Sequence, residues 1–245
     1  SVPDNKLETD KVVKLQSDID VNDMIKFYED GDYNSAKKVA IAITNQFPKH
    51  TLSWKVLGAV NIHQKLFEDA LYANKQAVFF DPKDIHTLNN LGVTYHNLKM
   101  FEKAEEIYLN LIKIAPKFSQ VYNNYGNTLT KLKKLDKAIS NYKKAIQLNP
   151  KFSDAYNNLA VILYDQGNLK EAKDNYKKSL AINPEFAKAH FNLGNLYNYS
   201  KKLKKAEECY KEAILINPQY FEAYNNLGFV QIKLKNYNDA ELFLL

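Results

Sequence analysis

Apolar side chains recur along the chain in two alternating stripes. The first stripe is formed by Tyr122, Tyr125, Gly126 and Leu129 in one example. The second is formed by Ala138, Tyr142 and Ala145 shortly afterwards. Spacings of three and four residues place side chains on one face of an α-helix. The pattern therefore predicts pairs of short amphipathic helices that follow one another along the chain.

Six prolines lie 34 residues apart and divide these pairs into units: Pro48, Pro82, Pro116, Pro150, Pro184 and Pro218. A proline ends a helix because it lacks the backbone N–H and disfavours helical geometry in the residue before it. We number each unit from 1 to 34 with the proline at position 32. The first helix then carries its stripe at positions 4, 7, 8 and 11, and the second carries its stripe at positions 20, 24 and 27.

This register gives six full units and one truncated unit: 17–50, 51–84, 85–118, 119–152, 153–186, 187–220 and 221–245. Residues 1–16 lie outside the pattern, and we expect them to form an N-terminal lead-in. A fixed period of this length indicates one helical hairpin that is copied and stacked. The truncated unit ends in Leu242–Leu245, and we expect the natural protein to continue past these apolar residues.

The unit resembles the tetratricopeptide repeat. The resemblance rests on a bulky residue at position 4, Leu-Gly at 7 and 8, alanine at 20 and 27, an aromatic residue at 24 and proline at 32. In the second unit these positions hold Trp54, Leu57, Gly58, Ala70, Ala77 and Pro82. The resemblance covers residues 17–245 and implies an all-α fold, a right-handed α-solenoid of helix-turn-helix units.

A second face of the first helix carries the most distinctive polar pattern. At about 100° per residue, positions 2, 6, 9 and 13 lie together, opposite the apolar stripe. Position 6 is asparagine in five consecutive units: Asn90, Asn124, Asn158, Asn192 and Asn226. Further asparagines stand at position 5 or 9: Asn89, Asn123, Asn157, Asn225, Asn127 and Asn195. In tetratricopeptide arrays, this face lines the concave side of the superhelix.

An asparagine side chain can accept from and donate to one peptide unit of a ligand, whatever the ligand's sequence. The row resembles the asparagine ladder of the O-linked N-acetylglucosamine transferases, which implies that it holds the backbone of an extended peptide. In the other interpretation, these amides only solvate the groove or cap neighbouring backbone groups. Backbone hydrogen bonds alone do not offset the cost of association. We therefore expect added side-chain contacts, with Lys131, Tyr164 and Tyr199 among the candidates.

Charge and composition narrow the partner. The net charge is +6, and residues 119–152 carry all of this excess, with seven lysines against Asp136 alone. The chain has no arginine, the side chain that best recognises guanine edges and phosphates. This absence argues against specific nucleic-acid recognition and against the carboxylate clamp of chaperone-binding repeats. No apolar run is long enough for a membrane span or a signal peptide, and we expect a cytoplasmic protein.

Catalytic signatures are missing from the sequence. It holds no phosphate-binding glycine loop, metal-spaced Cys/His set or nucleophile elbow, so we expect neither catalysis nor a cofactor in this chain. His63, His86 and His96 could approach one another on the groove side, which leaves a metal site as an alternative to three partly exposed histidines. Cys209 has no activating neighbour in sequence and is interpreted as a half-exposed thiol.

Three functions remain open at this point. The first is a protein-protein interaction module that binds an extended peptide or partner protein in the asparagine-lined groove. The second is the substrate-recognition arm of a larger enzyme, because "FPKHTLSWKVLGAV" resembles the first repeats of bacterial arrays joined to glycosyltransferase, sulfotransferase or hydroxylase domains. The third is a scaffold that associates with itself.

Overall fold

The structure is a computed structural model that describes residues 21–235, and all regular secondary structure in that range is helical. The predicted lead-in at 1–16 and the apolar end at Leu242–Leu245 lie outside the described residues. Residues 21–29 form the helix that begins the described chain. The all-α repeat array that the sequence predicts is confirmed.

Helices of two kinds alternate along the chain. Those at positions 1–13 are α3 (Thr51–His63), α5 (Ile85–Asn97), α7 (Ser119–Lys131), α9 (Ser153–Asp165), α11 (Ala187–Tyr199) and α13 (Phe221–Lys233). Those at positions 17–30 are α2 (Tyr33–Gln46), α4 (Phe67–Phe80), α6 (Phe101–Ile114), α8 (Leu135–Leu148), α10 (Leu169–Ile182) and α12 (Leu203–Ile216). We call the first kind A helices and the second kind B helices. Each B helix ends two residues before its proline.

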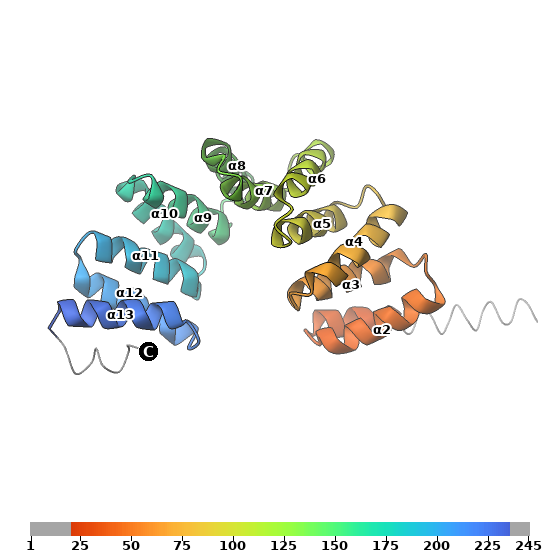
Figure 1. Ribbon diagram of the computed structural model, residues 1–245, viewed down its shortest axis with the longest axis horizontal. Coiled ribbons are helices and arrows are strands. Elements are labelled where there is room, and N and C mark those ends of the chain that lie inside the picture. Colours follow the sequence, from red (N-terminus) through yellow and green to blue (C-terminus); the bar gives the residue numbers. More distant parts are fainter. Residues whose placement is uncertain (1–20, 236–245) are drawn as a thin grey trace, which may run out of the picture. The chain divides into compact units, whose positions relative to one another are not determined.

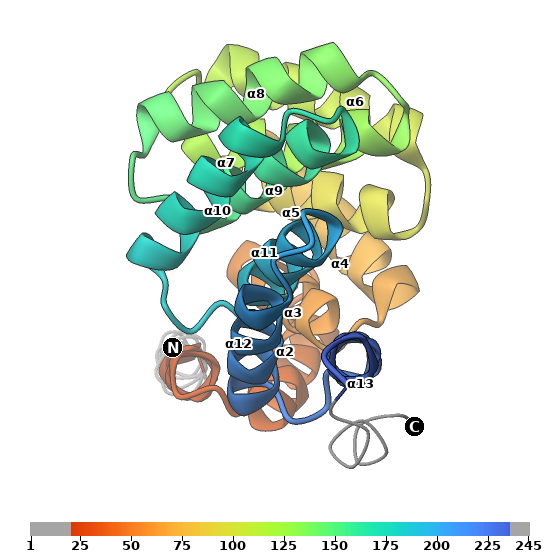
Figure 2. The ribbon, with the colours of Figure 1, turned by 90° about the vertical axis from the view of Figure 1, so that its left-hand side faces the viewer.

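The chain divides into two compact units, Ser1–Lys117 and Phe118–Leu245. In the first unit, α2, α3, α4, α5 and α6 pack each on the next, and α3 also contacts α5. In the second unit, α7 to α13 pack in the same sequential way, and α9 contacts both α7 and α11 (Figures 1 and 2). Within each unit the A helices therefore lie beside one another, and their outward faces form a row.

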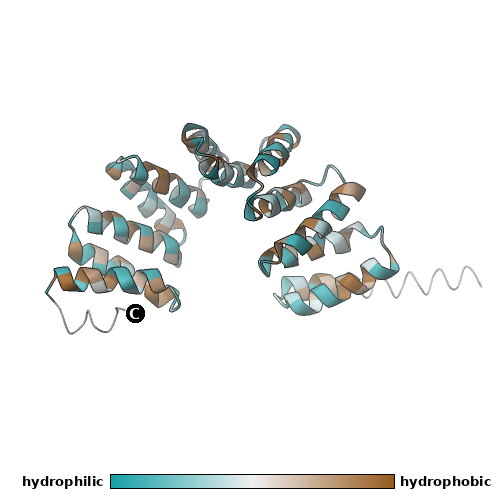
Figure 3. Cartoon of the chain, viewed as in Figure 1, coloured by the Kyte–Doolittle hydropathy of each residue, from teal (hydrophilic) through white to brown (hydrophobic). Residues whose placement is uncertain are grey.

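Burial confirms both predicted stripes. Tyr122, Tyr125 and Leu129 are buried on α7, as are Ala138, Tyr142 and Ala145 on α8. The A helices also bury positions 3 and 10, which the sequence pattern does not predict: Val121 and Thr128 on α7, Ala155 and Ile162 on α9, and Ala189 and Leu196 on α11. On α7 the buried side is thus broad and the opposite side is polar, whereas α13 also exposes Phe229 and Ile232. The hydropathy colours alternate along the A helices (Figure 3).

A glycine at position 8 allows the two helices of a hairpin to approach closely. A Cβ atom at Gly126 would lie 2.5 Å from the ring of Tyr142, and one at Gly194 would lie 2.6 Å from the ring of Tyr210. These distances are far shorter than a van der Waals contact between carbon atoms. The glycine therefore makes room for the tyrosine ring at position 24, which lies across the A helix.

Successive repeats are also tied together at the proline loops. The indole N–H of Trp54 donates to the carbonyl oxygen of Pro48 at 2.8 Å, and Nε2 of His190 lies 2.9 Å from the carbonyl oxygen of Pro184. Both donors stand at position 4, so this side chain fixes the start of an A helix against the preceding loop. None of the described helices is long and apolar enough to cross a membrane.

Candidate functional site: the asparagine row

The predicted polar face lies on the outward side of the A helices, and we call positions 2, 6, 9 and 13 the groove face. Position 2 is exposed in α7, α9, α11 and α13, and so is position 13, with Lys131 and Tyr199 among its members. Position 6 is half-buried in all of them. The row of Asn124, Asn158, Asn192 and Asn226 therefore lies within one compact unit, at the base of the groove face rather than at its rim.

The asparagines of successive repeats are hydrogen-bonded to one another. Asn158 Nδ2 donates to Asn123 Oδ1 and Asn127 Oδ1, both at 3.1 Å. Asn192 Nδ2 donates to Asn157 Oδ1 at 2.9 Å, and Asn226 Nδ2 donates to Asn195 Oδ1 at 2.8 Å. At 100° per residue, positions 5 and 9 face the following repeat and position 6 faces the preceding one. The row is thus a chain of amides in which Asn158, Asn192 and Asn226 are each held by an asparagine of the preceding repeat.

Tyrosines of the B helices donate hydrogen bonds to this chain of amides. The hydroxyl of Tyr142 donates to Asn127 Oδ1 at 2.8 Å, and that of Tyr210 donates to Asn195 Oδ1 at 2.7 Å. Burial raises the pKa of both phenols from 10.0 to about 12, so they stay protonated donors well into the alkaline range. In both places, the oxygen that accepts from the tyrosine also accepts from the next position-6 asparagine. The core tyrosine therefore helps to position an amide on the groove face.

The asparagines at position 5 of α5, α7 and α9 are more deeply buried than those at position 6. Asn89 and Asn123 are 6% exposed, and Asn157 is fully buried. Because Asn123 and Asn157 accept the hydrogen bonds of the next repeat, they can act on a ligand through Asn158 and Asn192. A direct contact between the position-5 side chains and a peptide stays a prediction. Asn225, which precedes the last asparagine of the row, is half-buried.

Asn90 lies in the first compact unit, on α5, and is half-buried as well. The A helix before it, α3, holds Val56 at position 6, and that side chain is buried. Among its described residues, the first unit therefore has one asparagine at position 6, whereas the second has four in successive repeats.

An open cavity of about 590 Å³ lies on the groove side of the second unit, over α9, α11 and α13. Its lining is Tyr164, Asn195, Asn198, Tyr199, Lys201, Asn226 and Lys233. The rings of Tyr164 and Tyr199 meet edge to face with centroids 5.9 Å apart. The structure thus brings two predicted aromatic candidates together with Asn195 and Asn226. The sequence prediction did not include Asn198, Lys201 or Lys233, although Lys233 shares position 13 with the predicted Lys131.

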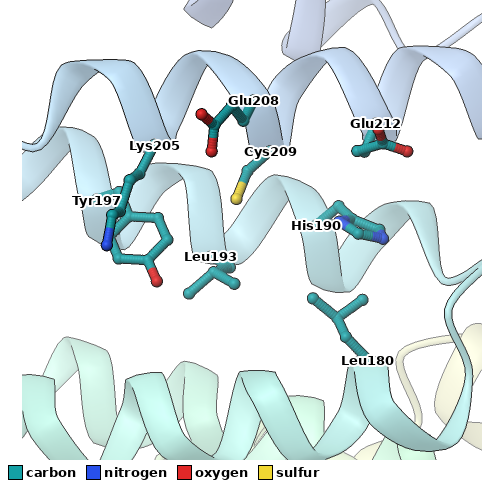
Figure 4. A pocket seen from close by; sticks show the side chains of 8 residues that line it. All are labelled: Leu180, His190, Leu193, Tyr197, Lys205, Glu208, Cys209 and Glu212. Atoms are coloured by element: carbon teal, nitrogen blue, oxygen red, sulfur yellow. The ribbon is translucent and has the colours of Figure 1, made fainter.

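A second cavity, of about 330 Å³, lies among α10, α11 and α12 and contains Cys209 (Figure 4). Burial, followed by the charges of Glu208 and Glu212, raises the pKa of the Cys209 thiol to about 11. A protonated thiol is a poor nucleophile and a poor metal ligand. The His190 ring nitrogen Nε2 is engaged by Pro184, so this cavity does not contain an activated cysteine. The predicted half-exposed thiol is consistent with this environment.

The histidine alternative finds no support in the described residues. The ring of His63 packs on Tyr33 with centroids 4.0 Å apart, and the ring of His96 packs against Phe101 at 5.4 Å. Between residues 21 and 235, no group of three or more His, Cys, Asp or Glu side chains is placed to hold a metal ion. His63 and His96 thus serve as packing side chains in the first unit.

Family comparisons agree with this geometry. A model described as TPR repeat matches residues 126–167 and 161–199. Models described as tetratricopeptide repeat match residues 26–85, 85–118, 107–140, 187–220 and 209–241. No curated protein matches the sequence.

Several solved structures share the fold. A chain of the APC/C hetero-tetramer Cut9-Hcn1 is 15% identical with a TM-score of 0.78, over 89% of this chain and 43% of that chain. PilF of Pseudomonas aeruginosa is 19% identical with a TM-score of 0.70, over 79% and 88%. A thermophilic TPR protein of Thermus thermophilus is 19% identical with a TM-score of 0.67, over 74% and 99%.

The chain thus spans less than half of the Cut9-Hcn1 chain that it matches, and at these identities the likeness is one of fold. Proteins built from such repeats are typically non-catalytic scaffolds that bind proteins or peptides. The family models together extend over residues 26–241, and the helical hairpins are in register with them. The chain therefore belongs to the tetratricopeptide repeat family and is a protein-protein interaction module.

Proposed function

We propose that the second compact unit binds an extended peptide along the groove face of α7, α9, α11 and α13, with the position-6 asparagines holding the peptide backbone. The observation that supports this most directly is the chain of asparagine hydrogen bonds between repeats. It holds polar side chains in a regular row at the base of the groove face. Packed helices lie about 8–10 Å apart, so the row matches roughly every third residue of an extended peptide.

Asn192 is the member best suited to bind a peptide unit. Its Nδ2 makes one hydrogen bond, to Asn157, which leaves its second N–H and its Oδ1 without a protein partner among the described residues. One donor and one acceptor on the same amide can pair with the C=O and N–H of a single peptide unit. Asn158 differs, because both N–H groups already donate within the protein and its Oδ1 accepts from Asn157 at 3.3 Å.

Prior ordering of the row favours binding. An asparagine that is already hydrogen-bonded to its neighbour loses little rotamer freedom when a ligand arrives, which reduces one cost of association. Each backbone hydrogen bond contributes only about 0.5–1.5 kcal/mol. Side chains above the row must therefore supply further affinity, and Lys131, Tyr164 and Tyr199 are exposed or half-buried on the same face.

The experiment uses peptides selected on the full chain from a random display library, followed by synthesis of one binder with each backbone nitrogen methylated in turn. If the asparagines hold the backbone, methylation at about every third residue should lower the affinity about tenfold, the equivalent of about 1.4 kcal/mol. Calorimetry measures the affinity. Binding that is insensitive to backbone methylation at every position would contradict the proposal.

A matched pair of variants separates ligand binding from structural support. Asn192→Ala should lower the affinity for the selected peptide about tenfold, because two hydrogen bonds to the ligand are lost. Asn158→Ala should mainly lower the free energy of unfolding, because its hydrogen bonds are internal. Urea unfolding measured beside calorimetry distinguishes the two effects, and an Asn192→Ala variant with full affinity would count against the row.

A further inference from the structure

We infer that the cavity over α9, α11 and α13 is a subsite for an acidic side chain of the bound peptide, with Lys201 and Lys233 as its charge-recognising residues. This inference rests on the proposed peptide binding and specifies the class of peptide. Asn226 links the asparagine row to the cavity, because it belongs to the row and also lines the cavity. A peptide held at Asn192 and Asn226 would extend a side chain into this space.

The charge of the cavity is positive and uncompensated. Its lining contains two lysines and no acidic side chain, and neither lysine forms an ion pair within the described residues. Lys233 Nζ donates to Asn198 Oδ1 at 3.2 Å, a neutral partner that holds the ammonium group at the cavity and leaves its charge unpaired. A lysine ammonium has three donors, so Lys233 keeps two for a ligand.

Asp165 is an acidic residue close in sequence to the lining residue Tyr164. It stands next to Tyr164 on α9 and contributes to the raised pKa of that phenol, after burial and the charge of Tyr199. Asp165 is exposed and is absent from the lining. The cavity therefore retains an excess of positive charge.

The walls of the cavity favour an ion pair. Tyr164 is half-buried and packs edge to face on Tyr199, which is 68% exposed. Aromatic surface displaces water and lowers the local dielectric constant, so that a lysine attracts a carboxylate more strongly than it would on an open surface. The lining amides of Asn195, Asn198 and Asn226 add polar groups around a carboxylate. Two lysines, three amides and two tyrosines form a pocket of suitable chemistry for aspartate or glutamate.

The two lysines stand at different positions of the repeat: Lys201 at position 15, which is lysine in five repeats, and Lys233 at position 13. Lys201 lies in the turn after α11 with φ of 57°, and Lys233 lies in the last turn of α13. They come from different repeats and meet at one cavity. The equivalents of Lys233 in the two preceding repeats are Asp165 and Tyr199, so the same combination does not recur at each step of the second unit.

The test selects peptides from a random display library on the full chain and on Lys201→Met/Lys233→Met. Methionine removes the charge, is one atom shorter than lysine, and keeps a Cβ atom at position 201, where φ is positive. The control variant is Lys143→Met/Lys177→Met, which removes two exposed lysines of the B helices α8 and α10. We expect Asp or Glu to be enriched at one register position with the natural chain and the control, and this enrichment to disappear with Lys201→Met/Lys233→Met. Circular dichroism should show equal helix content in all three proteins.

Synthetic peptides then separate the possible sources of the carboxylate. Replacing the enriched acidic residue by its amide should weaken binding to the natural chain about tenfold and leave binding to Lys201→Met/Lys233→Met unchanged. Equal losses on both proteins, or selected peptides without an acidic preference, would overturn the subsite but leave the proposed peptide binding intact. A loss on amidation of the peptide terminus alone would assign the cavity to a chain end and also overturn it. If no peptide is selected, both proposals are wrong.

Discussion

Position 15 of each repeat lies in the turn between the A and B helices and adopts a positive φ. Glycine takes this position at Gly31 and Gly167, and lysine takes it at Lys65, Lys99, Lys133, Lys201 and Lys235, with φ between 57° and 64°. Left-handed geometry costs a residue with a Cβ atom about 1–2 kcal/mol. The turn therefore carries local strain in five repeats that is absent from the other two.

We predict that Lys133→Gly stabilises the chain by about 0.5–1 kcal/mol, since the relief of left-handed strain exceeds the larger chain entropy of glycine in the unfolded state. Gly167→Ala should destabilise it by about 1 kcal/mol, because it introduces that strain. Urea unfolding at neutral pH measures both free energies. Lys133→Ala, which removes the charge but keeps the strain, is the control and should leave the stability nearly unchanged. A stabilisation as large in Lys133→Ala as in Lys133→Gly would attribute the effect to charge.

The asparagine row could be predicted from sequence only in part. The recurrence of asparagine at position 6 and its place opposite the apolar stripe follow from the 34-residue register and the helical angle. The pairing of Asn192 with Asn157 does not, because it depends on which flank of one A helix meets the next. The sequence does not show how neighbouring A helices meet. For this reason the buried position-5 side chains were expected in the groove, and Lys201 was not expected there.

At the scale of the helical hairpin, the contact between position 8 and position 24 links the core to the groove face. Gly194 leaves room for the Tyr210 ring, and the Tyr210 hydroxyl reaches Asn195, the residue next to that glycine. The hairpin of 153–186 has Ala160 at position 8 beside a buried Tyr176, and Val161 follows where an asparagine stands in its neighbours. Glycine at position 8 thus accompanies the tyrosine-asparagine hydrogen bond in two repeats. Gly92 also faces a tyrosine ring, that of Tyr108, with Val93 at position 9, so the glycine makes room for the ring whether or not that hydrogen bond forms.

We predict that Gly194→Ala destabilises the chain by about 1–3 kcal/mol, because the added methyl group meets the Tyr210 ring. In a Tyr210→Leu background, the same change should be neutral or stabilising, since alanine is the better helix former. A double-mutant cycle by urea unfolding measures the coupling. Additive effects of the two substitutions would show that glycine at this position does not serve the tyrosine.

The helices themselves could be predicted nearly in full, because each B helix ends at a proline loop and each stripe has a helical spacing. Burial at positions 3 and 10 was not predicted. Some of these positions hold small or weakly polar residues such as Thr128, and apolar members such as Ile162 and Leu196 lie beside the predicted stripe. They become buried only because a neighbouring repeat covers that flank. Local periodicity thus reveals the packing within a hairpin more clearly than the packing between hairpins.

On the scale of the whole molecule, buried tyrosines are distributed unevenly between the two compact units. Position 24 is tyrosine three times in the second unit, at Tyr142, Tyr176 and Tyr210, but only once in the first, at Tyr108. Burial raises the pKa of all four phenols, to about 12 for Tyr142 and Tyr210. In the unfolded chain a tyrosine ionises near pH 10. The native state therefore retains protons that the unfolded state loses above that pH.

This difference predicts alkaline unfolding that begins in the second unit. A raised pKa in the folded state contributes stability that is present below about pH 10 and is lost as the pH rises towards 12. Trp54 is the single tryptophan of the chain and lies in the first unit, so its emission wavelength reports that unit alone, whereas circular dichroism at helical wavelengths reports both. On raising the pH, helix content should fall before the Trp54 emission shifts to the red. Tyr176→Phe removes one buried ionisable hydroxyl and should move the first loss of helix to higher pH. The prediction would be contradicted if the loss of helix and the shift in Trp54 emission occurred at the same pH and Tyr176→Phe changed neither.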